Sequence, residues 1–154
     1  MATTITDSTL TVTVKEEITI NGIKNNSENE YTNTGINEIL KRIVTCPASQ
    51  DTTVFQFATG VYSAPGDLAV GDVKYFRITN KDDTNSCKVG YVTTNTNMTI
   101  NLGPLESQMF GATTALGFGD DDALPLFPTL ENLVKIIVDP AANAIDVEVF
   151  AASA

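Results

Sequence analysis

The 154-residue chain contains no histidine, no tryptophan and only two cysteines. Without histidine, Ser-His-Asp and Cys-His catalytic arrangements are excluded, and so are metal sites built on imidazole. Two isolated cysteines cannot build a structural zinc site unless carboxylates or another subunit complete it. Phosphate-binding glycine loops are also missing, since Gly117-Phe118-Gly119 is followed by acids and lacks the P-loop lysine. These absences predict a protein that is not an enzyme and that binds no cofactor.

Basic residues are scarce as well. Nine Lys and Arg stand against 19 Asp and Glu, which gives a net charge of −10. Because nucleic acids bind basic surfaces, we expect no nucleic-acid partner. The apolar runs are far shorter than a transmembrane helix, and the N-terminus lacks the basic and apolar segments of a secretory signal. We therefore expect no membrane partner either.

Acidic residues are the remaining candidates for chemistry, above all the consecutive Asp120, Asp121 and Asp122 in the glycine- and proline-rich stretch 111–128. Calcium takes oxygen ligands from loops, but an EF-hand needs acids at alternate positions and a distant Glu. The sequence favours a solvated acidic loop, with a calcium site or a contact between subunits as the alternative. A glycosidase pair of carboxylates is disfavoured, since the chain has few aromatic residues to surround it.

The chain is rich in Thr (22 residues) and Asn (13 residues), which favour strands and turns respectively. Alternating apolar and polar residues predict a strand over 9–20 with a bulge near Glu16-Glu17, ended by an Asn21-Gly22 hairpin turn. A return strand is expected to begin near Ile23 and to run into the polar residues 24–30, so that 23–35 forms a long exposed loop or a mobile hairpin tip. Ile36, Ile39, Leu40 and Ile43 follow a helical spacing and predict a short helix near 36–42.

Further strands are predicted over 43–46 and 53–58, and over 73–79, 87–93, 98–102 and 105–111, which read as a β-meander and a central sheet. Residues 130–138 and 144–150 are expected to form a closing hairpin. The predicted core comprises Val12, Ile20, Phe55, Phe57, Tyr75, Phe76, Ile78, Val89, Ile100, Phe110, Ile136, Val138, Val147 and Val149. Since Tyr75 and Phe76 cannot both point inward on one strand, one of them is expected to face a neighbouring subunit. Cys46 and Cys87 are expected to be reduced thiols packed in the core, with a disulfide as the alternative.

Many short strands at spacings of roughly 8–14 residues indicate an all-β protein, an antiparallel β-sandwich that is jelly-roll-like. We expect a flexible N-terminal arm over 1–8 and a single β-sandwich domain over 9–154.

Four segments of the sequence resemble those of a known family: INEILKRIVTCP, VKYFRITNKDDTNSCKVGY, INLGPLESQMF and LVKIIVDPAANAIDVEVF. In their residues and in their order along residues 9–151, these segments resemble small virion structural proteins of tailed bacteriophages. The resemblance implies a β-sandwich or jelly-roll module on a phage head, neck or tail, often a homotrimer, without catalytic residues. It also implies assembly in the host cytoplasm, which agrees with reduced cysteines.

Two functional hypotheses follow. The first is a capsid decoration (cement) protein, a homo-oligomer that binds the major capsid protein or a neighbouring virion protein. The alternative is a head-fibre, neck or tail module whose loops bind a host receptor or glycan. Thr4 and Ile5 in the arm, and the aromatic residues Tyr31, Phe118 and Phe127, are the candidate interaction residues.

Overall fold

The computed structural model describes residues 6–58, 68–93, 97–111 and 133–154, which contain eleven β-strands and no helix. The strands are β1 (Ser8–Ile20), β2 (Ile23–Ile36), β3 (Glu38–Cys46), β4 (Thr52–Ala58), β5 (Leu68–Ala69), β6 (Val73–Asn80), β7 (Cys87–Thr93), β8 (Asn97–Leu102), β9 (Ser107–Gly111), β10 (Leu133–Asp139) and β11 (Ile145–Ser153). In these ranges no helix is long and apolar enough to cross a membrane.

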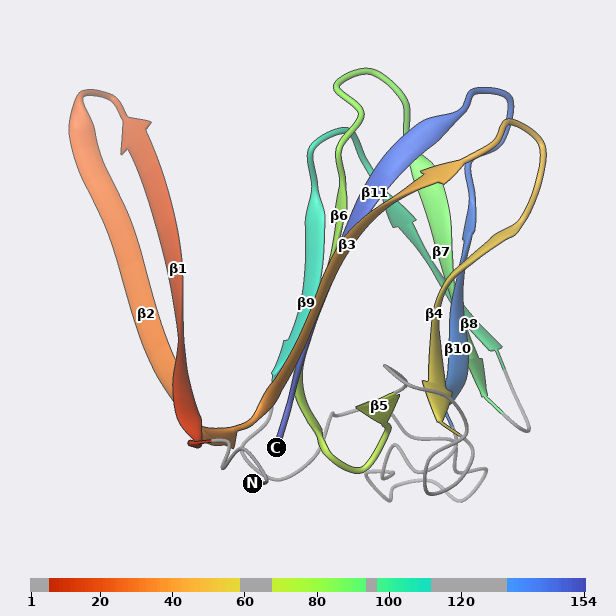
Figure 1. Cartoon of the computed structure of the whole chain (residues 1–154). Helices are drawn as coiled ribbons and strands as arrows, with labels where there is room; N and C mark the ends of the chain where they lie inside the picture. The colour runs from red at the N-terminus through yellow and green to blue at the C-terminus, as the bar shows by residue number, and fades with distance from the viewer. Residues whose placement is uncertain (1–5, 59–67, 94–96, 112–132) are drawn as a thin grey trace, which may run out of the picture.

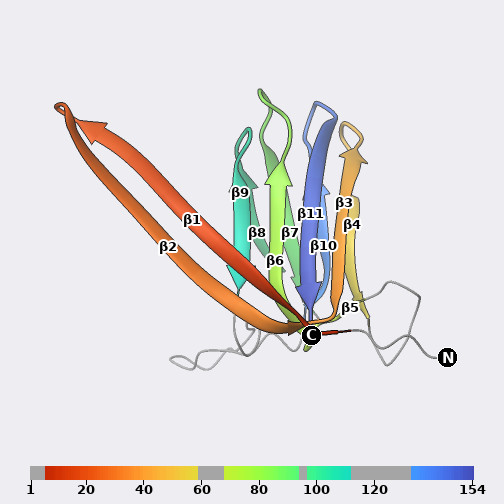
Figure 2. The same cartoon turned by 60° about the vertical axis from the view of Figure 1, so that its left-hand side comes forward.

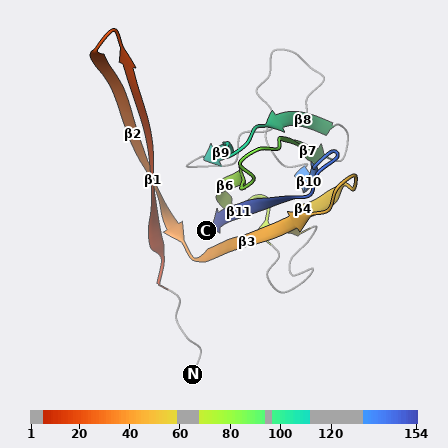
Figure 3. The same ribbon diagram turned by 90° about the horizontal axis from the view of Figure 1, so that it is seen from above.

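Two sheets lie face to face, and a separate hairpin projects from them (Figure 1). One sheet has the order β3-β11-β6-β9, and the other has the order β5-β4-β10-β7-β8. All pairings are antiparallel except that of the short β5 with β4. The hairpin consists of β1 and β2 and stands outside both sheets, as the view from above shows (Figure 3). The predicted all-β sandwich is therefore confirmed, and the helix near 36–42 is wrong.

The main core lies between the two sheets and follows the alternation of the strands. On β11, for example, Ile145, Val147 and Val149 are buried, while Asp146 between them is exposed. Phe55 is central to this core, with its ring centroid 4.7 Å from that of Phe57 on the same strand, in an edge-to-face arrangement. Burial of such apolar surface contributes about 25 cal/mol per Å² to folding.

Most of the predicted core is confirmed. Nine of its residues lie in this main cluster: Phe55, Phe57, Phe76, Ile78, Val89, Ile136, Val138, Val147 and Val149. Ile100 and Phe110 pack against it and are partly buried. Val12 and Tyr75 are buried in a second cluster under the hairpin, so Tyr75 is covered by the chain's own hairpin rather than left for a neighbour. The prediction for Ile20 is wrong, because it is exposed near the hairpin tip.

The hairpin is longer and more regular than predicted. Asn21 and Gly22 form its turn with φ values of 50° and 79°, as a two-residue hairpin loop requires. Pairing runs without a break from Leu10 to Ile20, so no bulge lies at Glu16-Glu17; the register shifts between Ser8 and Leu10 instead. The return strand expected from Ile23 is confirmed, whereas the loop over 23–35 is wrong, because these polar residues form β2 through backbone pairing with β1.

The predicted helix near 36–42 is part of a strand, β3. Leu40 and Val44 point toward the main core, while Ile39 and Ile43 point away from it. Apolar residues on both faces of the strand produced the spacing of a helix, and β-branched residues favour the strand. Pairing along the whole length of β11 then holds residues 38–46 in extended form.

The predicted closing hairpin is wrong and the predicted meander is only partly right, although their strands exist: β7 pairs with β8 as predicted, but β6 does not pair with β7, nor β8 with β9. β6 pairs with β11 and β9, whereas β7 pairs with β10 and β8, so the meander is divided between the two sheets. β10 and β11 are likewise in different sheets. The β6–β7, β8–β9 and β10–β11 connections each cross from one sheet to the other, which lets both strands bury an apolar face against the same core.

Cys46 at the end of β3 and Cys87 at the start of β7 are both free and buried in the main core. Burial raises the pKa of both thiols, that of Cys87 to about 11, with the charges of Cys46 and Asp139 adding to the effect. The prediction of reduced, core-packed thiols is confirmed.

Candidate interaction surfaces

The base of the hairpin is fixed on the outer face of the four-stranded sheet, the face turned away from the main core. Val12 and Ile36 of the hairpin bury themselves against Tyr75 and Ala152, and Leu10, Tyr31 and Phe150 complete this cluster. The Tyr75 and Phe150 ring centroids are 5.8 Å apart in an edge-to-face arrangement. Burial raises the pKa of both Tyr31 and Tyr75; the nearby Tyr75 raises the pKa of Tyr31 further, whereas Arg77 opposes the rise at Tyr75. The hairpin base is therefore a packed junction.

A sharp turn separates the hairpin from the sandwich. Gly35 has a φ of +77°, a left-handed conformation in which a side chain is unfavourable. Two residues later the Asn37 backbone N–H donates to the Ser153 carbonyl oxygen over 3.0 Å. The chain therefore leaves β2 and enters β3 without the two strands pairing, and the hairpin diverges from the sheet (Figure 2).

Beyond this junction lies the outer part of the hairpin, residues 15–30, and every one of them is exposed. From here on we call this part the arm; it is not the N-terminal segment predicted over 1–8. Ile18, Ile20 and Ile23 share the hairpin face that carries Leu10 and Val12 at the base, because alternate residues and cross-strand partners lie on one face. Their exposed fractions are 52%, 54% and 72%. One apolar stripe is thus used by the sandwich at its base and left uncovered toward its tip.

A second uncovered apolar feature lies on β3, an edge strand with only β11 as its partner among the described residues. Ile39 and Ile43 on its outer face are 65% and 60% exposed. Lys41 lies between them, with its Nζ 3.7 Å from Glu148, which also pairs with Arg77. Long edge strands with exposed apolar residues are templates for pairing with another strand.

Between the hairpin base and the outer face lies an open groove of about 360 Å³. Leu10 to Thr13 form one wall, and side chains of the sheet, including Tyr75, Arg77 and Met109, form the other. The groove results from the divergence of the hairpin from the sheet. It lacks the enclosure and convergent polar groups typical of a small-molecule site.

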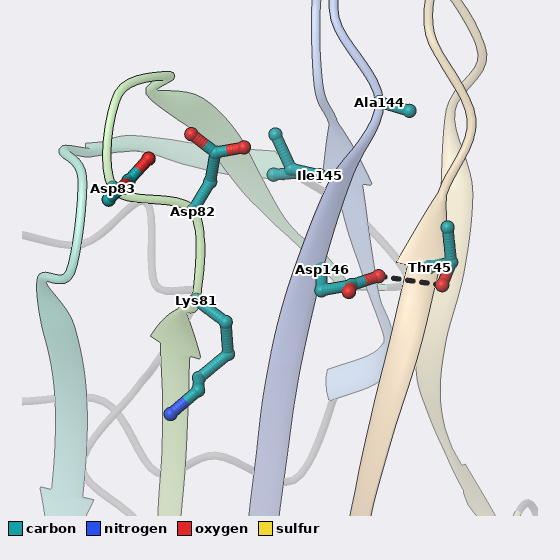
Figure 4. Close-up of a pocket in the computed structure, with 7 residues that line it drawn as sticks. All are labelled: Thr45, Lys81, Asp82, Asp83, Ala144, Ile145 and Asp146. Atoms are coloured by element: carbon teal, nitrogen blue, oxygen red, sulfur yellow. Dashed lines mark hydrogen bonds between the residues drawn. The ribbon is translucent and has the colours of Figure 1, made fainter.

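A second depression lies at the far end of the sandwich and is lined by Thr45, Lys81, Asp82, Asp83, Ala144, Ile145 and Asp146 (Figure 4). The Asp82 carboxylate accepts the Thr84 and Asn85 backbone N–H groups over 2.8 and 2.6 Å. These hydrogen bonds lower its pKa. The Thr45 hydroxyl donates to Asp146 over 2.6 Å. Two of the three acids are therefore committed to holding loops and strands in place.

Metal ligation finds no support within residues 6–58, 68–93, 97–111 and 133–154, where no group of three or more His, Cys, Asp or Glu side chains could hold an ion. Asp120, Asp121 and Asp122 lie outside the described residues. So do Thr4, Ile5, Phe118 and Phe127 among the predicted interaction residues.

Of those candidates, the structure places only Tyr31. It packs at the hairpin base and is partly buried, so it does not offer the exposed aromatic platform expected of a glycan-binding loop. Sequence analysis missed the exposed isoleucines of the arm and of β3. The alternation Ile39-Lys41-Ile43 is a usable signal for the β3 face, but it coincides with the helical spacing of Ile36, Ile39, Leu40 and Ile43.

Comparisons with known proteins give no family for this chain. No protein-family model matches it, and no curated protein matches it. A solved structure of Bacillus endospore appendages, described as a novel family of disulfide-linked pili, is similar over 75% of this chain and 88% of that chain. Its TM-score is 0.38 and its sequence identity is 12%, which is too low to support any conclusion about this protein.

Proposed function

We propose that this protein is a non-enzymatic structural subunit of a bacteriophage virion, a capsid decoration protein that binds the outer head shell and stabilises it. The observation that carries the proposal is the projecting arm. An isolated two-stranded hairpin is marginally stable at best in water, and this one leaves three isoleucines exposed. Such an arm is explained if a neighbouring subunit covers it in an assembly.

The architecture supports the same proposal. The order β3-β11-β6-β9 facing β4-β10-β7-β8 supports a jelly-roll assignment, and jelly rolls are common among capsid proteins. Two of the three acids lining the far depression, Asp82 and Asp146, hold loops and strands in place, which leaves them little freedom for chemistry. The resemblance of four sequence segments, in the same order, to virion structural proteins of tailed bacteriophages supports a phage origin.

The test uses virions of the phage that encodes the chain. Cryo-electron microscopy of particles made without the protein should show loss of density from the head shell, and purified protein should restore it. Unchanged shell density would overturn the proposal. Ile20→Asp should reduce incorporation at least about tenfold, because it places a charge in the surface that assembly would bury. Thr19→Asp, on the opposite face of the same strand, is the matched control and should be incorporated normally.

A further inference from the structure

We propose that the partner of the arm is a second copy of this chain, and that β1 of one copy adds in parallel to the free edge of β3 of the next. This inference deepens the proposed function and rests on it. Both elements have the unpaired backbone edge that strand addition requires: within the described residues β1 pairs only with β2, and β3 pairs only with β11.

The side chains of the two strands are complementary. On the stripe face of β1, Glu16 lies between Val14 and Ile18, and all three side chains point the same way. This gives an aliphatic–acid–aliphatic pattern at a spacing of two residues.

On the outer face of β3, Lys41 lies between Ile39 and Ile43 in the same spacing. In register, the two strands place Glu16 beside Lys41 and bring aliphatic side chains together on both sides of this pair. Opposite charges and aliphatic pairs across neighbouring strands stabilise a sheet.

The other face of each strand decides the direction of pairing. Arg42 follows Lys41, and Glu17 follows Glu16. Parallel addition places Arg42 beside Glu17, whereas antiparallel addition around the same central pair would place it beside Lys15, a like charge. The adjacent like charges in Glu16-Glu17 and in Lys41-Arg42 therefore favour parallel addition of β1 to β3.

Lys15, Glu17 and Lys41 already form ion pairs within one chain, but these pairs do not oppose the addition of β1 to β3 of another copy. Lys15 pairs with Glu17 over 2.8 Å, with both side chains more than half exposed. Lys41 is 60% exposed where it approaches Glu148. The Lys15–Glu17 pair is exposed and contributes little to stability. The Glu148 side chain is only 13% exposed, but it keeps Arg77 as its partner when Lys41 turns to Glu16.

The arrangement of the molecule permits this contact between successive copies. The arm leaves the sandwich past β9, while the β3 edge lies at the opposite side of the four-stranded sheet (Figure 2). β1 and β3 also run in the same general direction from the junction end (Figure 1). Parallel addition therefore joins copies head to tail, and such a contact forms a ring, such as the predicted trimer, if the rotation from one copy to the next closes.

Charge reversal tests the contact. The native protein, Glu16→Lys, Lys41→Glu and the double variant are compared by analytical ultracentrifugation over a range of concentrations. Each single reversal creates a like-charge contact and should weaken self-association at least about tenfold, and the double variant should return to within about threefold of the native protein. Lys24→Glu, on the other face of the arm, is the matched control and should associate normally. Circular dichroism should show that all variants remain folded.

A native chain that is monomeric at high micromolar concentration would overturn the inference. So would single variants that associate like the native chain, or a double variant as weak as the singles. The two proposals can fail separately. If the protein is monomeric in solution yet present on purified virions, only this contact is wrong; if it associates as described yet is absent from virions, only the proposed function is wrong.

Discussion

Tyr31 of the hairpin lies directly on Gly111 of β9, so closely that a β-carbon at position 111 would be 2.8 Å from the tyrosine Cζ. Only a residue without a side chain allows this approach, which joins the hairpin base to the edge of the four-stranded sheet. The glycine therefore helps to fix the direction in which the arm projects.

Gly111→Ala should displace Tyr31 and loosen the hairpin base. Overpacking of this kind lowers the free energy of unfolding by about 1–3 kcal/mol. Hydrogen exchange should accelerate in β1 and β2 more than in β10 or β11. Gly71→Ala is the control, since a β-carbon there meets no atom within 4 Å. Equal exchange in the hairpin of both variants would contradict the role of this contact.

Asn80 should be the most important polar residue of the sandwich. It is fully buried, and its Nδ2 donates to the Asn85 carbonyl over 2.8 Å and to the Gly103 carbonyl over 3.0 Å. Its Oδ1 accepts the Asp82 backbone N–H over 3.0 Å. Asn80→Ala leaves these backbone groups without their partner and should lower the free energy of unfolding by about 3 kcal/mol.

Urea denaturation measures this change. Asn101→Ala, at an exposed position on β8, serves as the control and should stay within about 0.5 kcal/mol of the native protein. If Asn80→Ala lowers the free energy of unfolding no more than the control does, the loop at Asp82–Asn85 and the loop at Gly103 hold together without the Asn80 amide.

Asn33 presents the opposite case at the hairpin base. Its side chain is 3% exposed, and neither amide atom has a hydrogen-bond partner among the described residues. A buried polar group without a partner is destabilising, so Asn33→Leu should raise the free energy of unfolding by about 1 kcal/mol. The thermal midpoint should rise, while Asn29→Leu on the exposed arm should give no gain. A lower midpoint for Asn33→Leu would mean that the amide is satisfied in the folded protein.

Stability should fall at alkaline pH because of Cys87. The pKa of its thiol is raised from 9.0 to about 11 by burial first, and then by Cys46 and Asp139. The folded state therefore keeps a proton that the unfolded state releases. The contribution is fully present below pH 9 and is lost as the pH rises toward 11, amounting to about 2 kcal/mol.

Denaturation in urea with reductant, from pH 8 to pH 11, measures this dependence. Cys87→Ala should show a shallower decline than the native protein over that range, because the titrating thiol is gone. Identical slopes would assign the alkaline loss to other groups, such as the buried tyrosines.

The candidate surfaces were only partly predictable. The exposed isoleucines are visible in the sequence, but their exposure is not, since Ile20 has the same local pattern as buried Val12. The two differ because the hairpin leaves the sheet at its base, and that divergence depends on the turn at Gly35 and the contact with Ser153. Neither the turn at Gly35 nor the backbone hydrogen bond to Ser153 produces a periodic pattern in the sequence.

The sequence by itself determined where most strands lie, where the first hairpin turns, and which side-chain types the chain lacks, because side-chain alternation, Asn-Gly turns and residue inventory are local properties. Tertiary structure decided which strands pair. β6 joins β9 rather than the adjacent β7, and residues 38–46 become a strand although their apolar spacing resembles a helix. These outcomes depend on burial against distant segments such as β11, and only the complete fold brings those segments together.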